Sequence, residues 1–400
     1  MREILRNLAR RKVRSALTVS GIVIGIFALT TMGALAEHFN SLLDLGVQYS
    51  ATAVRVGPPD GQQTALIPLS KGDEIGRVAG VAAVYASYQV AAQPGGQAIQ
   101  MGPPTMISNE NRGASAYGAP TIRIASGRDL AEGARGEVVL GAALATELGR
   151  KPGDAVDLPV RPKDAKPDFV DHRFRVVGVV AKTGNAIDDI GYVDDADARM
   201  LLRDTLPPAL RDAVDVNGLA QGFTVYGARG SSLSDLDAIA ARIDQQVSGV
   251  QAQKPSEQVA NFKSTGTTFT AIMTGAAVLA LIIGGLSVVN TMVMAVTERV
   301  REIGLKKALG AHTGQVLLEY LMEAAVIGLL GGSAGYLLGL GVTTAIDSLG
   351  SSGSLDIFLV TPRLTAAALG FAVAMATLAG IVPAVRAARL DPVAALRSQG

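Results

Sequence analysis

Four stretches of the chain are apolar and carry no Lys, Arg, Asp or Glu over the roughly 20 residues that a helix needs to cross a hydrocarbon core. They cover residues 16–36, 270–296, 324–346 and 364–385. A single charged side chain at the centre of such a helix costs about 2.5 to 3.5 kcal/mol on the insertion scale. The pattern therefore predicts a membrane protein with four transmembrane α-helices.

The long segment between the first two stretches has a different pattern. Short β-branched and alternating runs predict strands, and Gly/Pro clusters predict the turns between them. Ser70 with Asp73 and Glu74 predicts one helix start, and a second helix is indicated by an apolar stripe. The strand-like runs are 53–56, 84–90, 121–125, 137–140, 155–160, 174–181 and 223–226; the turns are 57–59, 94–96, 102–104 and 151–154; the stripe is Leu233, Leu236, Ile239, Ile243 and Val247. We expect an α+β domain in two lobes, large enough to bury its own core.

Helical spacing continues from the membrane stretches into this domain. Apolar residues and glycines recur at steps of three and four after the first stretch and again before the second. Two helical stalks that face each other are the natural interpretation, and two helices that only cap the domain core are the alternative. The stalk positions are Leu35, Phe39, Leu42, Gly46 and Tyr49, then Val259, Phe262, Gly266 and Phe269.

Charge along the chain orients these elements. Residues 1–15 carry a net charge of +5, 297–318 carry +2 and 386–400 carry +2, whereas 37–269 hold 22 basic and 27 acidic residues. Basic loops face the cytoplasm, so both termini are predicted to be cytoplasmic. The predicted order is an N-terminal segment (1–15), helix 1 (16–36), an extracytoplasmic α+β domain with stalks (37–269), helix 2 (270–296), a cytoplasmic segment (297–318), helix 3 with its entry turn (319–346), an extracytoplasmic loop (347–363), helix 4 (364–385) and a cytoplasmic tail (386–400).

The first stretch also imitates a secretory signal, because basic residues precede it and residues 34–36 form an A-x-A site. Signal h-regions span about 7 to 15 residues, so the greater length favours an uncleaved anchor. Small residues four apart favour close helix packing in membranes, with a substrate path as the alternative for the third stretch. The packing glycines are Gly21, Gly25, Gly331, Gly335 and Gly339.

Composition narrows the function classes. The chain has 48% hydrophobic residues, 18% charged residues, a mean hydropathy of +0.32 and a net charge of +1, which fits a membrane protein and gives no reason to expect nucleic acid. It has no Cys, and its three His residues lie far apart, so we expect no metal site. We find no catalytic motif and expect no catalytic residues. The acidic patch at 188–197 is better explained by a solvated loop in which Asp194 or Asp195 caps a helix than by a cation site.

The segment 297–311 is short, charged and amphipathic. As a helix it places Val296, Val300 and Ile303 on one side and Glu302 and Lys306, four apart, on another. It could rest on anionic lipid or dock a cytoplasmic partner, and its position alone does not separate the two. Glu319 and Glu323 follow near the membrane edge, where carboxylates are expensive unless paired, so we expect them to pair with basic residues of this segment. Asp391 with Pro392 predicts the start of a short terminal helix.

The pattern E-R-x-x-E-I-G-x-x-x-A-x-G-A at 298–311 resembles the signature of MacB/FtsX-type ABC transporter permeases, which include LolC/LolE-like relatives. Residues 7–25, the Glu323, Gly331-Gly332 and Gly335 pattern, and 383–396 also match. The outward domain matches more loosely, at 126–128, 141–149 and 175–179. The resemblance implies that 297–318 is a coupling segment; the candidate ATPase-docking residues are Glu298, Arg299, Arg301, Glu302, Gly304, Lys306, Lys307 and Gly310.

For function, the resemblance implies a non-enzymatic permease subunit in the bacterial cytoplasmic (inner) membrane. It would work as a homodimer or close heterodimer with ABC ATPase subunits, on which ATP and Mg would bind, and it would bind no cofactor itself. ATP-driven motion would pass through the stalks to the outward domain, often called mechanotransmission, to export or extract a hydrophobic or amphiphilic substrate. An extracytoplasmic adaptor or substrate protein and membrane lipid are the further expected partners.

One departure concerns the nucleotide site. MacB itself carries a fused ATPase, whereas this sequence begins at the first span and has no G-x-x-x-x-G-K-[ST] loop, so we expect the ATPase to be a separate polypeptide. Two other functions stay open at this point. One is an FtsX-like signalling scaffold that activates an extracytoplasmic partner such as a cell-wall hydrolase. The other is a membrane-tethered ecto-enzyme, which the missing catalytic constellation disfavours.

Overall fold

The computed structural model describes residues 12–60, 65–93, 105–111, 113–162, 165, 167–184, 186–207, 211, 215–349, 357–391, 393 and 395. The chain divides into two compact units. The first comprises Met1–His38, Thr267–Asp347 and Phe358–Gly400, and the second comprises Phe39–Gly266 and Ser348–Ile357. Most of the predicted N-terminal segment, the turns at 94–96 and 102–104, part of the loop after helix 3 and the end of the tail, including Pro392, lie outside the described residues.

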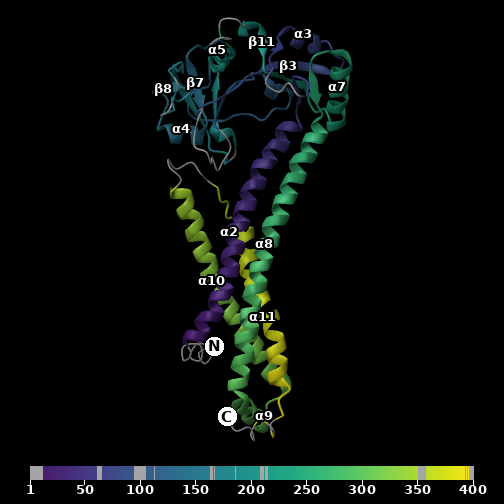
Figure 1. Cartoon of the computed structure of the whole chain (residues 1–400). Helices are drawn as coiled ribbons and strands as arrows, with labels where there is room; N and C mark the ends of the chain where they lie inside the picture. Colours follow the sequence, from purple (N-terminus) through teal and green to yellow (C-terminus); the bar gives the residue numbers. More distant parts are fainter. Residues whose placement is uncertain are drawn as a thin grey trace. The chain divides into compact units, whose positions relative to one another are not determined.

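Long helices form the first unit (Figure 1). They are α2 (Lys12–Ser50), α8 (Pro255–Glu298), α10 (Thr313–Leu349) and α11 (Pro362–Ala388), with the short helix α9 (Val300–Ala308) between α8 and α10. The four long helices are each long and apolar enough to cross a membrane. Both α2 and α8 continue without a break into the second unit, so each is longer than its predicted membrane stretch.

Helices of the first unit bury one face and expose large apolar residues on the other. Ala368, Ala372 and Ala376 of α11 and Val288 of α8 are buried in the helical core. By contrast Leu279 is 64% exposed. Apolar side chains that face outward are expected for helices surrounded by lipid, where the inner faces gain most from close packing.

Glycine residues allow the helices to pack this closely. Three glycines of α10 lie against α2. A Cβ added at Gly331 would lie 2.9 Å from Ile22 Cβ, one at Gly335 would lie 2.6 Å from Val23 O, and one at Gly339 would lie 2.8 Å from Thr30 Cβ. On α2 itself, a Cβ at Gly21 would lie 2.7 Å from Ser287 Cβ of α8, and one at Gly25 would lie 3.1 Å from Ala280 O. All five glycines singled out in the sequence therefore stand where two helices touch, as close helix packing requires.

The second unit is α+β (Figure 1). A four-stranded sheet has the order β13-β1-β12-β3, and a seven-stranded sheet has the order β4-β5-β10-β7-β9-β6 with β8 also paired to β9. The strands are β1 (Val54–Gly57), β2 (Ile67–Pro68), β3 (Val81–Ser87), β4 (Gln89–Ala91), β5 (Met106–Asn109), β6 (Ile124–Gly127), β7 (Glu137–Leu140), β8 (Ala155–Leu158), β9 (His172–Val180), β10 (Ile190–Val193), β11 (Leu219–Ala220), β12 (Gly222–Gly227) and β13 (Gln251–Gln253).

Helices complete this unit. They are α3 (Ser70–Gly76), α4 (Ala142–Leu148), α5 (Asp195–Thr205) and α7 (Leu233–Gln246), with 3-10 turns η1 (Ala114–Tyr117), η2 (Ala186–Asp189) and η3 (Val216–Gly218). One hydrophobic cluster contains Val54 and Phe223 of the smaller sheet together with Leu140 and Phe174 of the larger one. The sequence predicts two lobes; in the described part of the chain the four-stranded and seven-stranded sheets share this core, and β2 pairs with β11 in a separate two-stranded sheet.

The predicted strands differ from the observed strands mainly in where they end, and several short strands were not predicted. The run 137–140 coincides with β7, but β5, β10 and β13 were not predicted because each is short and lacks a long alternating pattern. The cap predicted at Ser70 is wrong: α3 has Leu69 at its N-cap with no side-chain hydrogen bond. In α7 the N-cap is Ser232, which forms a capping box with Asp235, and Leu236, Ile239 and Ile243 are buried as expected.

Replacing Gly335 by Ala should destabilise the helical unit by roughly 1 to 3 kcal/mol, because the new Cβ meets a backbone oxygen of α2 at 2.6 Å. Gly341→Ala on the same helix is the matched control, since its Cβ would meet nothing within 4 Å. The control should be neutral or stabilising by up to about 1 kcal/mol through helix propensity. Thermal unfolding of the two full-length variants in detergent measures the difference, and equal melting temperatures would contradict the packing role.

Asp189 should make the stability of the protein depend on pH. Burial, then the carboxylates of Asp188 and Glu147, raises the pKa of Asp189 from 3.8 to about 7. The folded form therefore holds a proton that the unfolded chain releases, and stability falls as the pH rises from about 4 through 7. Asp189→Asn should remove this loss, because an amide does not titrate, and should raise stability at pH 8. The expected gain is roughly 1 to 2 kcal/mol, since solvent screening reduces the effect of a half-buried group.

Melting temperatures measured from pH 4 to pH 8 check this expectation. The control is Asp157→Asn, whose residue is exposed in β8. A wild-type profile as steep as that of Asp189→Asn would exclude Asp189 as its source.

Candidate functional site

The segment 297–318, for which a coupling role is predicted, forms a corner between the long helices α8 and α10. Helix α8 ends at Glu298, Arg299 is the N-cap residue of α9, and α9 runs from Val300 to Ala308. After α9 the backbone N–H of Gly310 donates to Lys307 O at 3.0 Å and that of Ala311 donates to Lys306 O at 3.1 Å. Gly310 has φ +101°, which only glycine adopts easily, so its position is explained by the helix C-terminus that it closes.

Lys307 attaches α9 to the end of α11. Its Nζ donates to the backbone oxygens of Ala388 at 2.8 Å and of Leu390 at 2.7 Å. The last carbonyl groups of a helix have no hydrogen-bond partner within the helix and carry partial negative charge. A lysine at this end donates hydrogen bonds to them and interacts favourably with the helix dipole. Ile303 and Gly304 of α9 are buried on the same side.

Two ion pairs attach the corner to α10. Lys306 Nζ lies 2.7 Å from Glu319 Oε1, and Arg299 Nη1 lies 3.6 Å from Glu323 Oε2. The two pairs differ in burial: the Glu319 side chain is 50% exposed, whereas that of Glu323 is 12% exposed. Sequence spacing alone placed Glu302 beside Lys306, but the Lys306 ammonium reaches the next helix instead.

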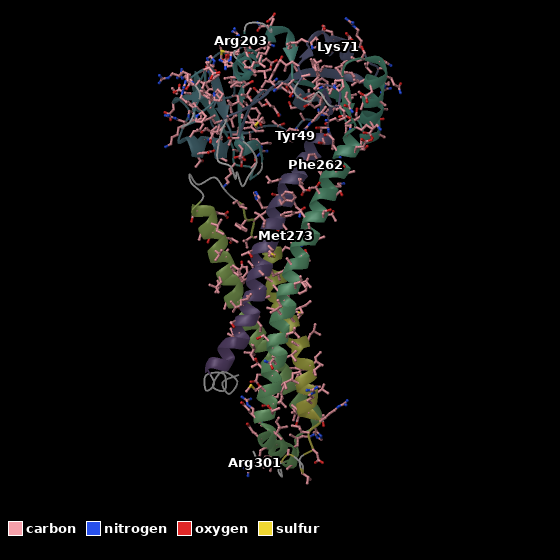
Figure 2. The ribbon with its side chains drawn as sticks, in the orientation of Figure 1. Tyr49, Lys71, Arg203, Phe262, Met273 and Arg301 are labelled. Atoms are coloured by element: carbon pink, nitrogen blue, oxygen red, sulfur yellow. The ribbon has the colours of Figure 1, made fainter. Side chains whose placement is uncertain are left out.

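The other side of α9 is exposed. Arg301 and Glu302 lie there, together with Leu305, which is 52% exposed, and Leu309, which is 80% exposed. Figure 2 shows Arg301 at the end of the long helices where α9 lies. The sequence analysis did not single out Leu305 and Leu309; their spacing of four residues opposite Ile303 was the available signal. One face is thus fixed to the protein, while the other presents two leucines flanked by both charge signs.

Within the second unit, the helical stalk positions of α2 and α8 meet. A Cβ on Gly46 of α2 would lie 2.9 Å from the ring of Phe262 on α8, and one on Gly266 would lie 2.6 Å from Asn40 Oδ1. Figure 2 labels Phe262 on α8 and Tyr49 at the end of α2. Val259 is buried, and Phe39, Leu42 and Tyr49 are half-buried. The stalk positions Leu35 and Phe269 are half-buried too, but they belong to the first unit.

Acidic residues of the 188–197 patch have separate structural roles. Asp188 accepts from the backbone N–H groups of Thr183 at 3.0 Å and Gly184 at 2.7 Å. Asp194 caps α5 by accepting from Ala196 N at 3.0 Å. Asp197 is buried and accepts from Arg135 Nε and Gly136 N, both at 2.7 Å. Each of these three carboxylates thus has donors of its own.

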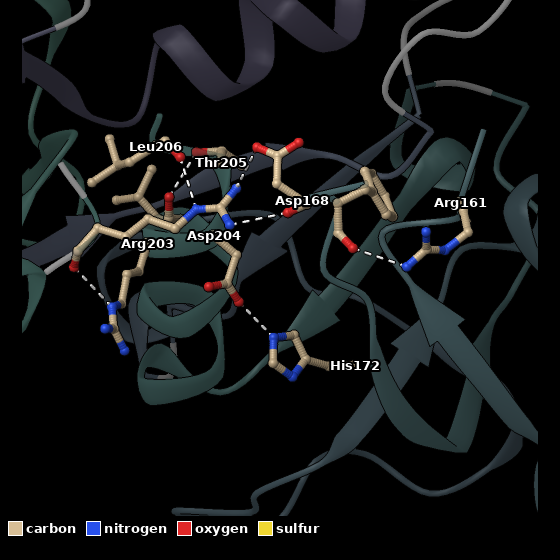
Figure 3. A network of polar contacts seen from close by, with 10 residues as sticks. Arg161, Asp168, His172, Arg203, Asp204, Thr205 and Leu206 are labelled. Atoms are coloured by element: carbon tan, nitrogen blue, oxygen red, sulfur yellow. Dashed lines mark hydrogen bonds and ion pairs between the residues drawn. The ribbon is translucent and has the colours of Figure 1, made fainter. Parts of the chain in front are cut away.

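A network of polar contacts joins α5 to the start of β9 (Figure 3). His172 Nε2 lies 2.5 Å from Asp204 Oδ2, and Arg211 donates to Leu206 O and Asp168 O at 2.9 and 3.0 Å. Among the residues that the structure describes, no group of three or more His, Cys, Asp or Glu could hold a metal ion. The network joins segments of the outward domain, and His172 is part of that joint.

Two family models match the chain. A MacB-like periplasmic core domain matches residues 15–253, and an FtsX-like permease C-terminal domain matches residues 274–392, which contain the whole of α9. With four long apolar helices and permease domains, the chain is a multi-pass membrane protein.

Relatives are similar over the full chain. It is 28% identical over 425 residues to the macrolide export ATP-binding/permease protein MacB of Marinobacter nauticus, covering 100% of this chain and 60% of that protein. It is 29% identical over 415 residues to MacB of an Azoarcus species, covering 100% and 59%. The chain therefore spans about 60% of the length of these two relatives.

Further similarity is partial. The uncharacterized ABC transporter permease YknZ of Bacillus subtilis is 32% identical over 182 residues, which cover 44% of this chain and 45% of that protein. The crystal structure of the extracellular domain of the noncanonic ABC-type transporter YknZ from Gram-positive bacteria matches with 12% identity and a TM-score of 0.31, covering 51% of this chain and 99% of that chain. A TM-score this low does not establish a shared fold.

Loss of the two ion pairs of α9 should have unequal effects. Arg299→Met should lower stability by roughly 1 to 3 kcal/mol, because it leaves the Glu323 carboxylate buried without its partner. Lys306→Met breaks an exposed pair and should cost less than about 1 kcal/mol. Denaturation of the full chain in detergent measures both, and equal losses would show that burial does not distinguish the two pairs.

Proposed function

Because the chain belongs to the family of MacB-like and FtsX-like ABC transporter permeases, we propose that it is a transporter permease whose helix α9 docks an ABC ATPase. The single observation that carries the docking proposal is the division of α9 into a fixed face and an exposed face. A helix that only closed a loop would gain nothing from exposing Leu305 and Leu309 beside charged residues. An amphipathic helix with such anchors suits a groove on a partner protein.

Contacts of α9 support a coupling role for it. Lys307 and Lys306 connect α9 to α11 and α10, and Arg299 connects the corner to Glu323. A displacement of α9 would therefore pull on several long helices rather than on a loose loop. This arrangement supports ATP-driven motion as the input that the permease receives.

Helix continuity supports mechanotransmission as the output. Helices α2 and α8 each run unbroken from the first unit into the second. Within the second unit the Gly46 to Phe262 and Gly266 to Asn40 contacts pack the two helices against each other. A hydrogen-bonded helix resists stretching along its axis, so a paired stalk would carry movement to the α+β domain.

For the setting of this activity we propose the bacterial cytoplasmic membrane, with both termini cytoplasmic. The basic flanks of the membrane helices support that orientation. The ATPase is proposed as a separate subunit that binds ATP and Mg, and a second permease copy completes the pair. The substrate class is hydrophobic or amphiphilic, and the relatives, which are transporter permeases, do not favour the signalling alternative.

Leu309→Asp should reduce capture of the ATPase at least tenfold while the chain still inserts and folds, because a charge at an apolar anchor of an interface costs more than about 1.4 kcal/mol. Wild type and variant are purified in mild detergent from the native membrane after gentle crosslinking, and companions are identified by mass. Val393→Asp is the matched control, since Val393 is 61% exposed and follows α11.

The outcomes separate the two uses of α9. Loss of the ATPase from Leu309→Asp alone supports docking. Unchanged capture of the ATPase by Leu309→Asp would instead show that this face of α9 does not hold the ATPase. A wild-type preparation without any ATPase, even after crosslinking, would overturn the proposal.

Glu302→Ala should uncouple ATP hydrolysis from transport. Its side chain is exposed on α9, so the substitution should leave insertion and melting temperature unchanged. The complex in lipid vesicles should keep at least half of its ATPase rate while substrate-dependent stimulation is lost. Gly304 is buried, so a substitution there would test packing rather than docking.

A further inference from the structure

Asn290 is the one carboxamide side chain in the four apolar stretches of the sequence, which together hold no Gln and no other Asn. It lies in α8, eight residues before the end of that helix at Glu298. At 1.5 Å per residue, that is about 12 Å along the helix axis. The short side chain cannot reach water over this distance, so its amide lies within the hydrocarbon.

Structure places this amide on the outer face of α8. Asn290 is exposed, and the described part of the chain gives its side chain no hydrogen-bond partner. The opposite face of α8 is in the helical core, with Val288 fully buried and Met292 2% exposed. In hydrocarbon an unpaired amide loses hydrogen bonds that lipid cannot replace, so the exposed position needs a partner from outside this chain.

The residues around Asn290 form a stripe. Along one line of α8 the exposed side chains follow at steps of seven, four, three, four and four residues. They are Ile272 (60% exposed), Leu279 (64%), Ile283 (67%), Leu286 (63%), Asn290 and Met294 (49%). We call these six residues the α8 stripe. A single Asn among large apolar residues at this spacing is the pattern that fixes register in paired helices.

We propose that the α8 stripe is the surface on which a second copy of this chain packs, with Asn290 of the two copies hydrogen-bonded to each other. Two copies inserted in the same orientation hold Asn290 at the same depth. A carboxamide has both donor and acceptor groups, so it is complementary to itself. A two-fold axis along the membrane normal then pairs each stripe with its copy.

A lipid tail offers neither donor nor acceptor, so lipid alone leaves the amide unpaired. A different permease with an apolar residue at this depth would also leave the Asn290 amide without a hydrogen-bond partner. The inference rests on the proposed function in one respect, that a second permease copy is present. It adds the face of the bundle and the residue that sets the register.

Cysteine crosslinking tests the surface directly, because the natural chain has no Cys. Leu279→Cys and Leu286→Cys of the full chain are oxidised in native membranes before detergent is added. Leu337→Cys on α10 (63% exposed) and Leu378→Cys on α11 (61% exposed) are controls of matched exposure. Disulfide-linked dimers should form at least fivefold more in the α8 variants than in the controls.

Equal crosslinking at all four positions would show random collision and overturn the proposal. So would crosslinking confined to a control position, since it would place another face at the interface. Crosslinking of an α8 variant to a different protein, identified by mass, would replace the second copy by that partner.

The role of Asn290 is tested by association of the full chain in lipid vesicles, followed by energy transfer between labelled copies. Asn290→Leu, which keeps size and removes hydrogen bonding, should weaken the dimer roughly 3- to 20-fold, the range for such bonds between membrane helices. Asn290→Gln should retain most of the association. An unchanged dimer in Asn290→Leu would show that the amide does not hold the interface.

Neither experiment requires ATPase activity or added nucleotide. Failure of the α8 crosslinks alongside normal ATPase capture would remove this interface and leave the proposed function standing. Strong α8 crosslinks in a preparation without any ATPase would support this interface and overturn the proposed function.

Discussion

Close contact between helix backbones is the constraint on which the helical unit depends. In lipid, apolar side chains gain little by leaving the surroundings, so helices associate where their surfaces fit and where polar groups find partners. The faces that meet α2 are glycine faces, and at Gly335 the added methyl group of alanine would already collide with a backbone oxygen. The arrangement of α2, α8 and α10 in this unit follows from those positions.

The helices and the interior of the outward domain were predictable to different degrees. Membrane helices were readable because a run of about 20 apolar residues without a charge is typical of a membrane span and too long for most buried helices. Helix α7 was readable from Leu236, Ile239 and Ile243, whose spacing repeats over three turns. Strands such as β5 and β10 were not, because four residues flanked by irregular chain give no period, and their place in the sheet is set by partners distant in sequence.

At the corner around α9, sequence indicated the residues but only partly their contacts. The motif at 298–311 drew attention to Arg299, Lys306 and Lys307 through a family resemblance. Spacing could not show that Lys307 would reach the last carbonyls of α11, 81 residues away for Ala388, because no local pattern encodes a meeting with another helix end. Leu305 and Leu309 were not singled out, because apolar residues are common in this chain and sequence alone does not show which of them are exposed.

The two faces of α9 share no residue, and this separation has an evolutionary consequence. Ile303, Gly304 and Lys307 face the protein, so substitutions among them are restrained by folding. Arg301, Leu305 and Leu309 face outward, so they can drift with almost no loss of stability. On the docking role proposed for α9, sister permeases that arise by gene duplication can therefore acquire different binding preferences by changing only the outer face, while each keeps the same helical scaffold.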